Sequence, residues 1–312
     1  MKLVVITGPT ASGKTALGVL LAEKLGGEVI NADSMQVYRQ MDIGTAKPKP
    51  EEMRDVPHHM INVASPTENY SVSRYVQEAS KCIEDVAARG RLPLIVGGTG
   101  LYIDSLIRGH DFAPQSGSLG LRALLSQEYD NNGGEAMLRR LREHDSEAAV
   151  RLHPNDKKRI LRALEVQLTT GTTISEHDSE TRRIPPRHEA VRIALNFRDR
   201  KELYERIDRR VDTMIEAGLL HEVRALLESG AEKSATAMQA IGYKELVAVL
   251  LGERSLEEAV SEVKRDSRRY AKRQLSWLGR HPETHWIYWE KETDFGAALL
   301  DSTKFLKISG IM

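Results

Sequence analysis

The sequence predicts a parallel α/β fold: a phosphate-binding-loop (P-loop) parallel sheet flanked by helices, with an inserted all-helical domain. Its first signal is the apolar run 3–7, followed by a glycine-rich turn and then a helical pattern. The second is the repeated alternation of apolar strands and helical patterns up to about residue 108, which is typical of parallel sheets. The third is the stretch 113–190, which has helical patterns, many charges and no convincing strand.

The first turn fits the strand–GxxxxGK[ST]–helix pattern of a phosphate-binding loop. Glycines let successive backbone N–H groups turn toward an anion, and the next helix directs its positive end to the same place. Lys14 adds a full charge, and the Thr15 hydroxyl can hold a magnesium ion. The expected phosphate-binding residues are Gly8, Pro9, Thr10, Ala11, Ser12, Gly13, Lys14 and Thr15. The loop alone does not identify the phosphate compound, or whether a phosphoryl group moves.

The remaining core elements follow from apolar runs, caps and breakers. We expect strands at 28–31, 59–63, 92–96, 191–197 and 285–289, and helices at 13–25, 71–89, 100–108, 200–217, 219–229, 243–251 and 255–278, with a further helix at the C-terminal end. The predicted core domain is 1–112 together with 191–312, and 113–190 is the insertion. Within the insertion, 169–188 reads as a long polar loop.

Three loops should converge, because ligands bind at the carboxyl ends of parallel strands. They are 8–15, 33–38 and 97–102. Asp33 follows a strand directly and could accept a proton, hold magnesium through water or cap a helix. Thr99 lies in a glycine-rich turn, so its hydroxyl could face the crevice or cap the next helix. These readings are compatible and stay open from spacing alone.

Two clusters of basic residues lie outside these loops. In the helix near the C-terminal end, six basic residues share one broad face: Lys264, Arg265, Arg268, Arg269, Lys272 and Arg273. Asp266 is the only acid between positions 264 and 280. A second cluster, at 157–162, opens a helix of the insertion. Such faces are often ordinary solvated surface, but a basic face in a neutral protein suits a phosphate backbone.

Composition excludes several classes. The chain has 312 residues, 45 basic and 45 acidic, so its overall charge gives no sign of nucleic-acid binding. Its one cysteine excludes an internal disulfide, and its ten histidines show no metal-ligand spacing. No apolar run is long enough for a membrane span, and no signal peptide is expected. We therefore expect a cytoplasmic protein.

Seven motifs together resemble the bacterial tRNA dimethylallyltransferase (tRNA isopentenyltransferase) family. They are GPTASGKT (8–15), DSMQVY (33–38), MDIGTAKP (41–48), GGTGLY (97–102), HPNDKKRILRALE (153–165), AIGYKE (240–245) and YAKRQLSWL (270–278). They span nearly the whole chain in the order of the family, and several are more specific than the phosphate loop. The departures are mild, such as Leu-Gly-Arg directly after Trp277.

This resemblance implies transfer of a dimethylallyl group from dimethylallyl diphosphate to N6 of the adenosine 3′ of the anticodon. Asp33 would be the general base, Thr99 would lie near the bridging oxygen, and Arg210 would support the phosphates, with Mg²⁺ at Thr15. The implied tRNA contacts are Asp33, Ser34, Met35, Gln36, Thr99, Arg122, Lys158, Arg159, Ile160, Leu161, Arg162, Gln239, Ala240, Ile241, Gly242, Tyr243 and Lys244, and the basic face adds Arg268, Arg269 and Lys272.

The expected partners are the tRNA anticodon stem-loop and dimethylallyl diphosphate, with no membrane and a monomeric state. The main alternative is a small-molecule P-loop kinase that transfers the γ-phosphate of ATP. A third class, a non-catalytic RNA-binding GTPase-like module, is disfavoured because no guanine-specifying NKxD is present.

Overall fold

The computed structural model describes residues 1–109 and 119–311, apart from the side chain of Arg182. The chain forms two compact units, Met1–Gly109 with Arg187–Met312, and His110–Pro186. The predicted division placed the boundaries at 112 and 191.

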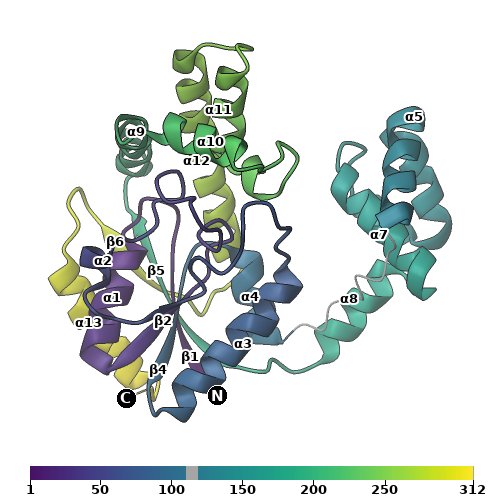
Figure 1. Ribbon diagram of the computed structural model, residues 1–312. Coiled ribbons are helices and arrows are strands. Elements are labelled where there is room, and N and C mark those ends of the chain that lie inside the picture. The colour runs from purple at the N-terminus through teal and green to yellow at the C-terminus, as the bar shows by residue number, and fades with distance from the viewer. Residues whose placement is uncertain (110–118, 312) are drawn as a thin grey trace. The chain divides into compact units, whose positions relative to one another are not determined.

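A six-stranded parallel sheet forms the centre of the larger unit (Figure 1). Its strands are β1 (Lys2–Thr7), β2 (Gly27–Asn31), β3 (His58–His59), β4 (Leu92–Val96), β5 (Glu189–Phe197) and β6 (His285–Trp289), in the order β3-β2-β4-β1-β5-β6. Because β2, β4 and β1 are neighbours, the loops after them leave the same edge of the sheet side by side. The convergence of these three loops follows directly from this order.

The predicted strand at 59–63 is shorter than expected. Only His58–His59 pair with β2, and the backbone then turns. Met60 and Asn62 have φ values of 63° and 59°, a left-handed conformation that no strand continues through. The apolar pattern had indicated a strand, but local turn geometry ends it after two residues.

Helices cover the sheet and build a second layer beyond its carboxyl edge. They are α1 (Lys14–Leu25), α2 (Pro50–Met53), α3 (Val72–Ala88), α4 (Gly100–Arg108), α9 (Arg200–Glu216), α10 (Leu219–Glu228), α11 (Tyr243–Leu250), α12 (Leu256–Leu278) and α13 (Phe295–Ile308), with a 3₁₀ turn at Ala237–Gln239. Ser71 caps α3 through the amide of Arg74, and Ser255 with Glu258 forms a capping box on α12. Helices α9 to α12 contribute most of the walls described below.

The apolar core lies under the central strands. Val4, Ile6, Leu94, Ile193 and Leu195 are fully buried and form one cluster with the apolar face of α1. Gly18 of α1 lies so close to β4 that an added Cβ would come within 2.7 Å of Val96. This tight packing fixes the start of α1, and therefore the phosphate loop, against the sheet.

The smaller unit is helical, as predicted. Its helices are α5 (Leu119–His144), α6 (Ser146–Arg151), α7 (Lys157–Thr170) and α8 (Ile174–Arg183). Gly133 interrupts α5 with φ 78° and ψ 163°. The predicted long loop at 169–188 is wrong, because α8 lies within it. Thr173 and Glu176 form a capping box that starts α8 despite its polar composition.

Candidate active site

The phosphate loop joins β1 to α1 and has the backbone that its glycines allow. Gly8, Ala11 and Gly13 have φ values of 148°, 64° and 89°. A Cβ at Gly8 would lie 2.5 Å from the carbonyl oxygen of Leu195, so only glycine fits this approach. The loop is therefore held open as a backbone cradle at the N-terminus of α1, the arrangement that binds phosphate.

Lys14 reaches back over this loop. Its Nζ donates to the carbonyl oxygen of Pro9 at 3.2 Å. The pKa of Lys14 is lowered to about 8, mainly by burial and then by the nearby charge of Arg210, while Asp33 acts in the opposite direction. Lys14 therefore lies close enough to Arg210 to feel its charge, and two neighbouring cations suit a polyanion.

Asp33 follows β2, and its two carboxylate oxygens have different surroundings. Its Oδ1 accepts from the amides of Met35 and Gln36 at 2.9 and 3.3 Å, which caps a turn at 34–37 rather than a helix. Within the described residues, Oδ2 accepts no hydrogen bond. One carboxylate oxygen thus fixes the side chain, and the other remains available for chemistry.

Thr99 begins α4, but its side chain does not cap that helix. Its Oγ1 instead accepts from the amide of Ser34 at 3.0 Å and lies 3.3 Å from the Ser34 hydroxyl. Tyr270, from α12, lines the same cavity as Asp33. Burial, followed by the charge of Asp33, raises the pKa of Tyr270 to about 12, so the phenol keeps its proton near neutral pH.

Arg210, on α9, borders every hollow of this region. It lines a cavity of about 290 Å³, a recess of about 60 Å³ at the phosphate loop and an open groove of about 1090 Å³. Its Nη2 lies 3.5 Å from the carbonyl oxygen of Thr45, and burial lowers its pKa. The guanidinium therefore stands where these spaces meet.

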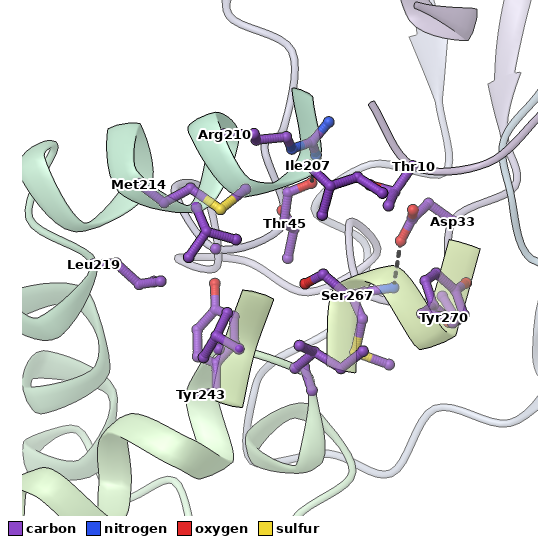
Figure 2. Close-up of a pocket in the computed structure, with 18 of the residues that line it drawn as sticks. Thr10, Asp33, Thr45, Ile207, Arg210, Met214, Leu219, Tyr243, Ser267 and Tyr270 are labelled. Carbon is purple, nitrogen blue, oxygen red and sulfur yellow. Dashed lines mark hydrogen bonds between the residues drawn. The ribbon is translucent and has the colours of Figure 1, made fainter. Parts of the chain in front are cut away.

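The 290 Å³ cavity has two chemically different ends (Figure 2). Met214 and Leu219, from α9 and the start of α10, contribute apolar side chains at one end. Asp33 and Tyr270 lie at the other end, where the hydrogen bond that Asp33 accepts from the backbone amide of Met35 is drawn. The recess continues from this polar end, because Asp33 and Tyr270 line both spaces.

Gln274 is a site residue whose role sequence reasoning missed. Its Oε1 accepts from the amide of Thr10 at 2.8 Å, and its Nε2 donates to the carbonyl oxygen of Gly98 at 2.9 Å. One turn further on, Trp277 donates to Asp104 at 2.6 Å and packs closely on Gly100. The specific AKRQLSW motif was visible, but only the fold shows that it ties α12 to two of the three loops.

Arg206 was also missed as a site residue. It lies one turn before Arg210 on α9, lines the groove and is placed 3.4 Å from the carbonyl oxygen of Ala11 in the phosphate loop. The signal was the spacing of two arginines on one helical face directly after a strand. The phosphate loop therefore faces a second guanidinium from α9.

The residues expected to contact tRNA differ in accessibility. Arg122, Lys158, Arg159, Gln239, Lys244, Arg269 and Lys272 are exposed; Ser34, Met35, Thr99, Arg162, Ile241 and Arg268 are partly buried. Ile160, Leu161, Gly242 and Tyr243 are buried, as are Ala240 at 8% exposure and Gln36 at 9%. The exposed residues can therefore contact RNA directly through their side chains. The buried residues can only hold the surface residues in position. The contacts themselves stay predictions.

The basic face of α12 is less free of acids than the sequence suggested. Arg268 donates to Asp208 at 2.7 Å and Lys264 pairs with Asp212 at 2.6 Å, both acids coming from α9. Arg269 pairs with Asp266 at 3.2 Å. Among the described residues, Lys272 has no ion pair and is exposed, so it is the cation on this face most available to a phosphate backbone.

The recess offers oxygen ligands for a magnesium ion. Thr15, Asn31, Asp33 and Gln36 line it with a hydroxyl, a carboxylate and two amides. The described residues contain no group of three or more His, Cys, Asp or Glu side chains that could hold a metal by themselves. This donor set fits Mg²⁺, which binds through few protein oxygens together with substrate phosphates and water.

Fold and site define a class: an α/β protein with a phosphate loop, a carboxylate and two arginines around one junction. Family comparisons agree with this class. Residues 36–281 match the IPP transferase family, and residues 1–65 match the isopentenyl transferase family. The tRNA dimethylallyltransferase of Acetivibrio thermocellus is 46% identical over 303 residues, covering 97% of this chain and 96% of the relative.

Solved structures give the same answer. The tRNA isopentenylpyrophosphate transferase of Bacillus halodurans is 41% identical with a TM-score of 0.74, and the alignment covers 98% of this chain and 95% of that one. A eukaryotic dimethylallyltransferase acting on tRNA is 30% identical with a TM-score of 0.82, covering 98% and 79% of the two chains. The chain therefore belongs to the tRNA dimethylallyltransferase family and is a transferase. Among the described residues, no helix is long and apolar enough to cross a membrane.

Proposed function

We propose that this enzyme transfers a dimethylallyl group from dimethylallyl diphosphate to N6 of the adenosine 3′ of the anticodon in tRNA. One observation carries the proposal: Asp33 and Arg210 line both the cavity and the recess of the phosphate loop. A base in the cavity and a diphosphate in the recess would meet between these two side chains. That is where a proton must be accepted and negative charge must be stabilised.

The apolar end of the cavity suits the dimethylallyl group. Met214 and Leu219 offer hydrocarbon surface, whereas the polar end offers Asp33 and Ser267 to an adenine. In this placement, the allylic carbon lies at the junction beside Arg210. The family name of the relatives supports the donor class, and the two-ended cavity supports its orientation.

In the proposed reaction, this chain's own residues accept the proton and stabilise the leaving group. The lone pair of N6 forms a bond to C1 of the donor, while the C1–O bond breaks and its electrons leave with diphosphate. The N6 proton goes to Oδ2 of Asp33, because Oδ1 already accepts two backbone amides. Lys14, Arg206, Arg210 and the loop amides stabilise the charge that develops on the leaving group.

Thr99 and Tyr270 position the acceptor end of the site. The hydroxyl of Thr99 accepts from the backbone amide of Ser34 and so fixes the turn that carries Asp33, while Tyr270 lines the cavity beside Asp33. Thr15 would hold Mg²⁺, which would add positive charge beside the diphosphate.

The tRNA would bind through exposed cations, with Lys272 on the core and Lys158 and Arg159 on the insertion. The target adenine must leave the stacked anticodon loop to enter the cavity, which costs a few kcal/mol. Contacts with the phosphate backbone offset this cost. Since tRNA is the proposed substrate, we also place the enzyme in the cytoplasm; a monomeric state stays a prediction.

The proposal is tested by incubating the enzyme with radiolabelled dimethylallyl diphosphate and an unmodified tRNA that has adenosine 3′ of the anticodon. We expect label in N6-modified adenosine, and none when that adenosine is replaced by guanosine. A parallel reaction with γ-labelled ATP covers the kinase alternative. Label transferred only from ATP would refute the proposed function.

A further inference from the structure

The structure assigns to Glu222 the role of a positioning residue that holds the wall between the cavity, the recess and the groove. This inference rests on the proposed function for its readout. The wall is the loop 42–48: Gly44 and Thr45 line the cavity, Ala46 and Pro48 line the recess, and Asp42 and Ile43 line the groove. No residue of this loop is anchored by a sheet pairing, so its position depends on side-chain contacts.

The carboxylate of Glu222 accepts four hydrogen bonds, three of which come from this loop. Oε2 accepts from the amides of Asp42 and Ile43 at 2.9 and 2.7 Å. Oε1 accepts from the amide of Gly44 at 3.2 Å and from the hydroxyl of Tyr243 at 2.6 Å. Three consecutive backbone amides that converge on one point form an anion-binding nest, and Glu222 fills it from the first turn of α10.

The packing around this anchor leaves little freedom. A Cβ at Gly44 would lie 2.4 Å from the ring of Tyr243, so the loop lies directly against the ring. Tyr243 is fully buried, and burial with Glu222 beside it raises the pKa of its phenol. The phenol therefore stays protonated and donates to the carboxylate.

From the loop, a chain of contacts leads to both proposed reaction residues. The carbonyl oxygen of Thr45 accepts from the Nε2 of Gln36 at 3.2 Å and lies 3.5 Å from Nη2 of Arg210. The backbone amide of Gln36 in turn donates to Oδ1 of Asp33 at 3.3 Å. Glu222 touches neither Asp33 nor Arg210, and it acts on them through the position of the Thr45 carbonyl.

The same nest has a second consequence. Three unpaired amides at the groove that Lys14 also lines would themselves attract a phosphate, and could compete with the cradle at Lys14. By filling the nest, Glu222 removes this competing place for the diphosphate. Removing its carboxylate should therefore free the loop and also open a site for small anions.

The test compares Glu222→Ala, Glu222→Gln and the control Glu228→Gln in the purified full-length enzyme. Glu228 is exposed on the same helix, so this control removes a charge without touching the loop. A misplacement of about 1 Å in a site costs on the order of 100-fold in rate, so we expect kcat to fall about 100-fold in Glu222→Ala and less in Glu222→Gln. We expect the control to match the wild type.

Chemical rescue separates positioning from general loss of structure. Sodium formate carries the missing carboxylate into the nest, so it should raise kcat of Glu222→Ala severalfold, whereas formamide should not and neither should affect the wild type. In an Arg210→Ala background, the Glu222→Ala change should cost far less than it does alone, because both act on the same step. A fully additive loss, or no rescue by formate, would overturn the inference.

If Glu222→Ala does not fold, a second variant tests the positioning role of Glu222. Tyr243→Phe removes one of the four donors and leaves the carboxylate on the loop, so a smaller loss of kcat is expected with unchanged circular dichroism. Hydrogen exchange on the wild type should show slow amides at 42–44. Unchanged kcat in Tyr243→Phe together with fast exchange at these amides would contradict the role of Glu222. A wild type with no transferase activity would instead contradict the proposed function.

Discussion

The charge state of Lys14 should control the affinity for diphosphate in the pH range just above neutrality. Burial and the neighbouring Arg210 bring its pKa to about 8, so the ammonium form is about nine-tenths of the total at pH 7 and about one-tenth at pH 9. The pKa is lowered, so charge is lost as the pH rises through 8. Bound diphosphate favours the charged form, so affinity should fall as the pH rises.

The magnitude follows from linkage. Above pH 8, each further pH unit removes up to tenfold in affinity, or about 1.4 kcal/mol, for as long as binding requires the proton on Lys14. The ligand can only gain negative charge as the pH rises, which favours binding, so it does not contribute a change of the same sign.

The assay is calorimetric titration of inorganic diphosphate with Mg²⁺ from pH 6.5 to 9.5, on the wild type and on Lys14→Arg. The wild type should lose affinity with a midpoint near pH 8, and Lys14→Arg should give a weak but flat profile because arginine does not titrate there. Arg210→Ala removes one cause of the shift and should move the midpoint upward. A flat wild-type profile, or affinity that rises with pH, would refute the reasoning.

Three further outcomes are expected. Asp33→Asn keeps the acceptor for the turn but not the base, so kcat should fall by about 10²–10⁴ with tRNA affinity nearly unchanged; an unaltered kcat in single-turnover assays would remove Asp33 as the base. Met214→Ala lengthens the apolar end of the cavity and should raise kcat/KM for geranyl diphosphate relative to dimethylallyl diphosphate at least about tenfold, which Met214→Leu should not do. Lys272→Ala should weaken tRNA binding and reduce its salt slope by about 1, whereas Arg268→Ala, which only frees Asp208, should change the slope less; equal slopes in filter-binding assays would contradict this ranking.

Local signals predicted most of the core. The phosphate loop, the strands and the capped helices depend on glycines, apolar runs and cap residues that act within a few positions of each other. The two local failures have different causes, an overlooked cap and a backbone turn. The capping box of Thr173 and Glu176 starts α8 in a stretch whose polarity indicated a loop. The left-handed backbone at Met60 ends β3, and an apolar pattern carries no sign of it.

The contacts that shape the site could not be predicted in this way, because they join distant positions. Glu222 lies far along the chain from the loop that it anchors, and Gln274 lies equally far from Thr10 and Gly98. The ion pairs on the basic face of α12 could not be predicted either, for the same reason. Its own sequence contains one nearby acid, but Asp208 and Asp212 of α9 pair with its cations in the fold.

The central claim is that the phosphate loop holds a leaving group while carbon is attacked. It is tested most directly with a donor whose oxygen between C1 and the first phosphorus carries a heavy isotope. Mass spectrometry of the products from unmodified tRNA should find the heavy oxygen in free diphosphate and one added C5H8 unit on adenosine. A phosphoryl group on the tRNA, or the heavy oxygen retained on the prenyl group, would contradict the claim.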